Sequence, residues 1–130
     1  IEKNSKTIAI WGVAFKPGTD DIREAPAIDI IQHFLNLKFK IQVYDPVAAE
    51  NARAHFGNNN DISFYDDQYD ALKNADALVI PTEWKSFREP DFAKMKSLMK
   101  ANLIFDGRNI YSPKYIKQNG FNYFSIGRPK

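Results

Sequence analysis

Three short apolar runs without polar alternation constrain the fold of this chain more than any other feature. They occupy residues 7–11 (TIAIW), 77–80 (ALVI) and 102–105 (NLIF). Uninterrupted apolar runs of this length are typical of strands that are buried on both faces of a parallel sheet. Two alternating runs, at 41–43 and 62–64, suit strands nearer an edge, and residues 122–126 are a candidate final strand.

Helix signals lie between these runs. Pro26 begins a segment with apolar residues at helical spacing, and proline fits the first turn of a helix. The pair Asp45 and Pro46 predicts an N-cap followed by proline at the first helical position, in a helix that Gly57 ends. The remaining helix boundaries are predicted at Pro90, Ser112, Pro113 and Gly120.

Strands that alternate with helices predict right-handed crossovers and an α/β fold. We expect a three-layer α/β/α, Rossmann-like domain with a mainly parallel sheet and the strand order 3-2-1-4-5. A length of 130 residues favours a single domain over residues 1–130. The first residue is Ile1 rather than methionine, so we expect this domain to be cut from a longer protein.

Composition argues against several classes of function. A net charge of +2 gives little attraction to nucleic acid or anionic membranes, so we expect neither as a partner. No run approaches the roughly 20 apolar residues of a membrane-spanning helix, and no signal peptide is apparent, which favours the cytoplasm. The chain has no cysteine, and His33 and His55 are far apart, so no metal site is expected.

A polar segment follows each of the three buried runs. These segments are residues 15–24, 82–88 and 106–109. Parallel strands end at one edge of their sheet, where open α/β sheets bind ligands, so the segments should converge there. Lys16 suits a phosphate oxygen, Arg108 suits phosphate, carboxylate or sugar hydroxyls, and Phe15 can stack on a base. The set favours a nucleotide or a nucleotide-sugar as ligand.

The same residues also have structural explanations, which the sequence leaves open. Phe15 fits a core position, Lys16 fits a solvated one, and Arg108 can pair with Asp106. The nearby acids can stabilise the next helix, because negative charge is favourable at a helix N-terminus. Arg23 has no such explanation, because a positive charge at that end opposes the helix dipole. These acids are Asp20, Asp21 and Glu24.

Asp45 follows the second predicted strand, where an acid would hold the ribose in a dinucleotide-binding fold. Its place before a proline at a predicted helix start is a sufficient structural explanation. The glycine-rich G-x-G-x-x-G fingerprint is also missing, with only Gly12 in position. We therefore do not expect a complete NAD pocket within this domain.

Five sequence blocks follow one another in a fixed order. They are GVAFKPGTDDIREAP at 12–26, YDP at 44–46, ADALVI at 75–80, TEW at 82–84 with FR at 87–88, and DGRN at 106–109. From about Lys6 to Tyr111, the chain resembles the C-terminal, UDP-sugar-binding domain of the UDP-glucose/GDP-mannose dehydrogenase family.

This resemblance implies a function. Enzymes of the family oxidise the C6 alcohol of a nucleotide-sugar to a carboxylate with two molecules of NAD, which an N-terminal domain binds. By the resemblance, Phe15 lies against the base, and Lys16 and Arg108 contact the substrate. Arg23 would reach across the domain interface to NAD, which accounts for a cation that the helix dipole disfavours.

The family's thioester-forming cysteine has no counterpart in this chain, so we expect no catalytic residue here and no activity of the chain alone. We expect this chain to be the substrate-binding domain of an NAD-dependent nucleotide-sugar 6-dehydrogenase. The expected enzyme is of the UDP-glucose to UDP-glucuronate type, which serves polysaccharide biosynthesis. Its expected partners are the nucleotide-sugar, the rest of the same polypeptide and a homo-oligomer of the full enzyme. GDP-mannose and UDP-N-acetylhexosamine enzymes share the blocks, so the sugar stays open.

Two other interpretations remain open. A free-standing regulatory module would use Asp20, Asp21 and Asp45 as a receiver-like carboxylate cluster. An interaction domain would expose an aromatic patch for subunit contact. The residues of that patch would be Trp84, Phe87 and Tyr111.

Overall fold

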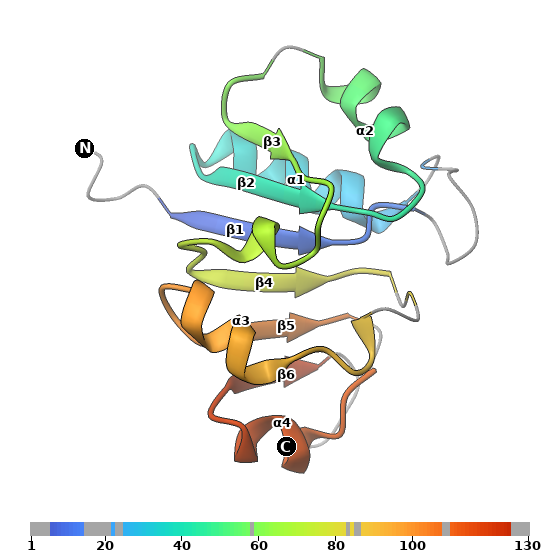
Figure 1. Ribbon diagram of the computed structural model, residues 1–130. Helices are drawn as coiled ribbons and strands as arrows, with labels where there is room; N and C mark the ends of the chain where they lie inside the picture. Colours follow the sequence, from blue (N-terminus) through green and yellow to red (C-terminus); the bar gives the residue numbers. More distant parts are fainter. Residues whose placement is uncertain are drawn as a thin grey trace.

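A six-stranded parallel sheet is the centre of the molecule (Figure 1). The computed structural model describes residues 6–14, 22, 25–57, 59–82, 84, 87–107 and 110–125. The strands are β1 (Thr7–Trp11), β2 (Lys40–Tyr44), β3 (Ile62–Phe64), β4 (Ala77–Ile80), β5 (Leu103–Asp106) and β6 (Asn122–Ser125). Their order, β3-β2-β1-β4-β5-β6, and their parallel pairing confirm the predicted topology and extend it by the sixth strand.

Helices cover both faces of the sheet and complete the three predicted layers (Figure 1). They are α1 (Pro26–Asn36), α2 (Ala49–Phe56), the 3-10 turn η2 (Asp70–Leu72), α3 (Phe92–Leu98) and α4 (Pro113–Gln118). One apolar cluster joins α1 and α2 to one face of the sheet, and a second joins η2, α3 and α4 to the other face. The two layers of helices thus bury the sheet between them.

Strand β1 shows why its sequence has no polar alternation. Ala9 and Trp11 belong to the cluster on the α3 face, whereas Ile8 and Ile10 belong to the cluster on the α1 face. All four residues are buried, because successive side chains of a strand point to opposite faces and both faces are covered here.

Two helix starts differ from the prediction, whereas α1 begins at Pro26 and α4 follows its Ser112 cap as expected. Helix α2 begins only at Ala49, because the Asp45 carboxylate closes a turn before the helix instead of capping it. Helix α3 begins two residues after Pro90, because the Asp91 side chain is the N-cap and accepts a hydrogen bond from the Lys94 amide. Gly57 ends α2 with a positive φ, as predicted.

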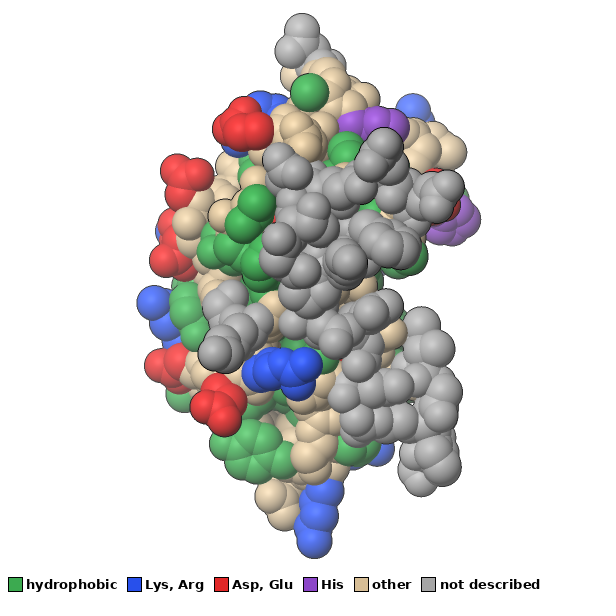
Figure 2. Space-filling model, turned by 90° about the vertical axis from the view of Figure 1, so that its right-hand side faces the viewer, with side chains coloured by type: hydrophobic (Ala, Val, Ile, Leu, Met, Phe, Trp, Pro, Cys, Tyr) green, Lys and Arg blue, Asp and Glu red, His purple; other side chains and the backbone are tan. Residues whose placement is uncertain are grey.

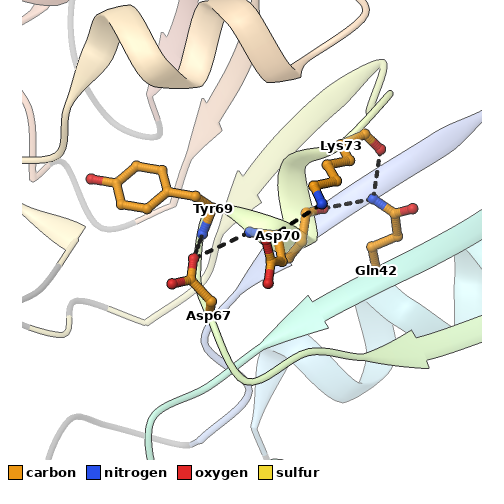
Figure 3. Close-up of polar contacts among 6 residues, drawn as sticks. Gln42, Asp67, Tyr69, Asp70 and Lys73 are labelled. Carbon is orange, nitrogen blue, oxygen red and sulfur yellow. Dashed lines mark hydrogen bonds and ion pairs between the residues drawn. The ribbon is translucent and has the colours of Figure 1, made fainter.

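The crossover from β3 to β4 is fixed by polar contacts around η2 (Figure 3). The Asp67 carboxylate accepts hydrogen bonds from the Tyr69 amide at 2.7 Å and from the Asp70 amide at 3.3 Å. The side-chain amide of Gln42, in β2, donates to the Ala71 carbonyl at 2.7 Å. Through the Gln42 contact, η2 is tied to β2.

Both histidines are exposed, His33 on α1 and His55 on α2. Among the described residues, His, Asp and Glu side chains nowhere form a group of three that could hold a metal ion. No helix in the described part of the chain has both the length and the apolar character to cross a bilayer.

Candidate functional site

The loops after β1, β4 and β5 leave the sheet at one edge. These strands are direct neighbours, and the register pairs Ile10 with Val79 and Ile80 with Asp106. Figure 2 looks onto this edge, where all strands end. The predicted convergence of the strand ends is therefore observed. The predicted site residues and nearby acids lie outside the described residues: Phe15, Lys16, Asp20, Asp21, Arg23, Glu24 and Arg108. What the structure describes is the framework that carries them.

Asp45 anchors the loop after β1. Its side chain is buried, with 4% of the residue exposed, directly after β2. One carboxylate oxygen accepts hydrogen bonds from the Val13 amide at 2.7 Å and the Ala14 amide at 3.3 Å. The other accepts from the Val47 amide at 2.8 Å and the Ala48 amide at 2.6 Å. A single carboxylate thus fixes the last described residues before Phe15.

The same carboxylate also reaches the loop after β4, because the Trp84 indole nitrogen donates to it at 3.3 Å. With protein donors on both oxygens, Asp45 has a structural role and is not free to bind a ribose. The structure thus favours the structural explanation of this residue.

Gly12 and Thr82 hold the loops after β1 and β4 together. Gly12 has a φ of +98°, and its amide donates to the Tyr44 carbonyl at 2.8 Å. The buried Thr82 hydroxyl donates to the Ala14 carbonyl at 2.8 Å. Since glycine adopts this backbone conformation without a Cβ clash, the lone glycine left from the dinucleotide fingerprint has a packing role.

Asp106 anchors the loop after β5. It is 1% exposed, and one of its carboxylate oxygens accepts hydrogen bonds from the Ile110 amide at 2.7 Å and the Tyr111 amide at 3.2 Å. The Tyr123 hydroxyl donates to the same oxygen at 2.6 Å. The Gly107 amide donates to the Ile80 carbonyl at 3.0 Å, which ties this loop to β4. Arg108 lies in sequence between these anchored positions.

The aromatic residues beneath the loops form a core. Phe87 is fully buried and stacks on Trp11 with ring centroids 5.1 Å apart. Tyr111 is also buried, and its hydroxyl donates to the Phe87 carbonyl. Burial, and secondarily the nearby Asp106, raise the pKa of Tyr111 far above its ordinary value. Trp84, which is half-buried, packs against this cluster.

These rings form a packed aromatic cluster beneath the loop after β4. The alternative of an exposed aromatic patch is wrong for Phe87 and Tyr111, because both side chains fill the space between α3 and the sheet.

An apolar groove of about 320 Å³ opens at the ends of β4, β5 and β6 on the α1 face. Phe105 and Phe124 stack on each other there, with ring centroids 5.3 Å apart, and both are partly exposed. Ile30 and Phe34 of α1 line the opposite side. A lining of this kind does not suit the charged diphosphate of a nucleotide.

Sequence reasoning missed three residues of this framework. The contact of Thr82 with the loop after β1, the backbone contacts of Asp106 and the role of Tyr123 were not predicted. An acid directly after a predicted strand was an available signal for Asp106, as it was for Asp45. Nothing local marked Tyr123, because its partners lie 12 and 17 residues earlier in the chain.

Comparisons with known proteins agree with this geometry. The model of the UDP-glucose/GDP-mannose dehydrogenase family, UDP binding domain, matches residues 9–113. The UDP-glucose 6-dehydrogenase of Pseudomonas aeruginosa is 43% identical over 96% of this chain and 28% of its own length. The UDP-glucose 6-dehydrogenase of Bacillus subtilis is 41% identical over 95% of this chain and 26% of its own length.

A solved structure is similar over nearly the whole chain. The NDP-N-acetyl-D-galactosaminuronic acid dehydrogenase from Methanosarcina mazei Go1 superposes with a TM-score of 0.79 at 27% identity, over 98% of this chain and 26% of that one. The chain thus spans little more than a quarter of the length of these relatives. The chain belongs to the UDP-glucose/GDP-mannose dehydrogenase family and corresponds to its UDP-binding, C-terminal domain.

Proposed function

We propose that this chain is the substrate-binding domain of an NAD-dependent nucleotide-sugar 6-dehydrogenase of the UDP-glucose to UDP-glucuronate type. The observation that carries the proposal is the anchoring of three loops at one edge of the sheet by Asp45, Thr82 and Asp106. Those loops contain the blocks that resemble the family, and the most similar relatives reported above are UDP-glucose 6-dehydrogenases.

In this proposal, Phe15 packs against the base while Lys16 and Arg108 neutralise the negative charge of the nucleotide-sugar. Charge-assisted hydrogen bonds of this kind contribute about 1.5–3 kcal/mol each. Phe15 directly follows Ala14, whose amide and carbonyl are both bound within the framework. The chain therefore enters the ligand-binding segment from a fixed point, which lowers the entropic cost of ordering it around a ligand.

We do not expect an NAD site within the described residues alone. The glycine-rich fingerprint is missing, and backbone amides occupy the Asp45 carboxylate that would otherwise bind a ribose. We propose that NAD is bound mainly by the rest of a longer polypeptide, and that Arg23 reaches it from this domain. The 26–28% coverage of the relatives supports this division.

The chain contains no cysteine, so the covalent step of the oxidation would also belong to the rest of that polypeptide. The proposed role of this domain is to bind the nucleotide end of the substrate and to complete the pocket in the homo-oligomeric enzyme. With half of a pocket, the chain alone should bind UDP weakly and catalyse nothing.

Isothermal titration of the 130-residue chain with UDP tests the proposal. We expect weak binding, which Lys16→Ala and Arg108→Ala each reduce about tenfold, equivalent to about 1.4 kcal/mol. Lys100→Ala is the matched control, because Lys100 is exposed and lies before β5, at the opposite edge of the sheet. No heat with millimolar UDP or GDP would contradict the proposal, and tighter binding of GDP would redirect it to a GDP-sugar.

A further inference from the structure

Tyr123 contributes a buried hydroxyl to the loop after β5. Its residue is 6% exposed, and it lies opposite Ile104 in the register of β6 with β5. Its hydroxyl donates to the Asp106 carboxylate at 2.6 Å and lies 3.3 Å from the Tyr111 carbonyl oxygen. One side chain of the last strand therefore contacts both ends of the loop between Asp106 and Tyr111.

These contacts converge on a single oxygen atom. The Asp106 Oδ2 that receives the Tyr123 hydroxyl also accepts the Ile110 and Tyr111 amides. A carboxylate at 1% exposure needs such donors, because an unsatisfied buried charge costs several kcal/mol. The hydrogen bonds that satisfy this charge also join the end of β5, at Asp106, to the residues that lie shortly before α4, Ile110 and Tyr111.

The network continues to the neighbouring loop. The hydroxyl of Tyr111 donates to the Phe87 carbonyl, in the segment after β4, and the Gly107 amide donates to the Ile80 carbonyl at the end of β4. Packing alone would not require these polar groups, since an apolar side chain could fill the same volume. The network instead fixes the described residues on both sides of Arg108 in the sequence, which are Asp106, Gly107, Ile110 and Tyr111.

We propose that Tyr123 and Asp106 are positioning residues for nucleotide binding, which hold the loop between β5 and α4 so that Arg108 meets the anionic part of a nucleoside diphosphate. This inference rests on the proposed function. Neither residue contacts the ligand, so both act through Arg108, and their effect on affinity requires that arginine.

Tyr123→Phe in the 130-residue chain provides the test, because it removes one oxygen and keeps the buried ring. UDP affinity should fall about three- to tenfold, the range that one hydrogen bond supplies. Amide hydrogen exchange should accelerate at Ile110 and Tyr111, which share the Asp106 oxygen. Tyr69→Phe is the matched control, because its hydroxyl accepts the Asp91 amide at 2.8 Å, outside this loop, and its UDP affinity should not change.

A double-mutant cycle with Arg108→Ala separates positioning from general stability. If Tyr123 acts through Arg108, then Tyr123→Phe should not weaken UDP binding further once Arg108 is alanine. Additive losses, or an equal loss in Tyr69→Phe, would overturn the inference while leaving the proposed function intact. A native chain that does not bind UDP would contradict the proposed function and the inference together.

Discussion

Gly12 and Thr82 approach so closely that a Cβ built on Gly12 would lie 2.7 Å from the Thr82 Cβ. Gly12 directly follows β1 and Thr82 follows β4, so this contact sets the spacing between two of the three loops at the candidate site. Gly12, the one glycine in the position expected from the dinucleotide-binding fingerprint, is thus required for a close contact between two loops.

Gly12→Ala should therefore be strongly destabilising. The new methyl group would meet Thr82, and the residue would have to keep a φ of +98°. Together these should lower the free energy of unfolding by about 2–4 kcal/mol, measured by urea denaturation.

Gly57→Ala is the matched control for this change. Gly57 also has a positive φ, of +62°, but nothing lies within 4 Å of its added Cβ. Its ψ of −143° lies in a region that only glycine readily adopts, so alanine should lose about 1–3 kcal/mol from backbone strain alone, less than Gly12→Ala. Equal losses in the two variants would show that the contact between Gly12 and Thr82 is unimportant.

Asp45→Asn should destabilise the chain through unpaired backbone amides. Its two oxygens together accept hydrogen bonds from four backbone amides, and an asparagine nitrogen cannot accept any of them. We expect a loss of about 2–3 kcal/mol in denaturant unfolding.

Asp61→Asn provides the comparison for the loss of a charge alone. Asp61 is a partly exposed partner of Lys40 at 2.8 Å, and such pairs contribute at most about 1 kcal/mol. The anchoring role of Asp45 would be refuted by a loss no larger than that of Asp61→Asn.

The raised pKa of Tyr111 predicts that the folded chain loses stability at alkaline pH. Its pKa is raised in the folded chain, by burial first and by Asp106 second, whereas an unfolded tyrosine ionises near pH 10. Above about pH 10 the unfolded chain releases a proton that the folded chain keeps, so stability should fall by about 1.4 kcal/mol per pH unit for this group.

Urea unfolding measures this dependence of stability on pH. The range from pH 8 to pH 12 covers about two units on either side of an ordinary tyrosine pKa. At pH 8, about two units below that pKa, Tyr111→Phe should be less stable than the native chain, because it loses the hydrogen bond to the Phe87 carbonyl. Above about pH 10, the stability of the variant should fall less steeply than that of the native chain. Some slope should remain, since burial also raises the pKa of Tyr44. Parallel curves for the native chain and the variant would contradict this assignment.

The sequence was sufficient for the parts of the fold that depend on local pattern. The apolar run of β1 predicted a strand buried on both faces, and Pro26 predicted the start of α1. The start of α2 was misplaced because an aspartate before a proline can cap either a helix or a preceding turn. Only the positions of the Val13 and Ala14 amides, more than 30 residues away, show why Asp45 does the latter.

The candidate site was predictable in location but not in construction. Parallel strands require the loops after β1, β4 and β5 to share an edge, so residue order alone was enough to place them. The bonds from Tyr123 to Asp106 and from Thr82 to Ala14 join segments 17 and 68 residues apart. Such contacts form only once the sheet is assembled, so no local sequence pattern predicts them.

Mapping the UDP contact by NMR of the ¹⁵N-labelled chain tests the central claim most directly. Saturating UDP should shift the amide resonances at the carboxyl edge of the sheet, above all Val13, Ala14 and Gly107. Amides at the opposite edge, such as Lys40 and Asp76, should not move. Shifts confined to that opposite edge, or none at millimolar UDP, would contradict the assignment of a nucleotide-binding site to the loops after β1, β4 and β5.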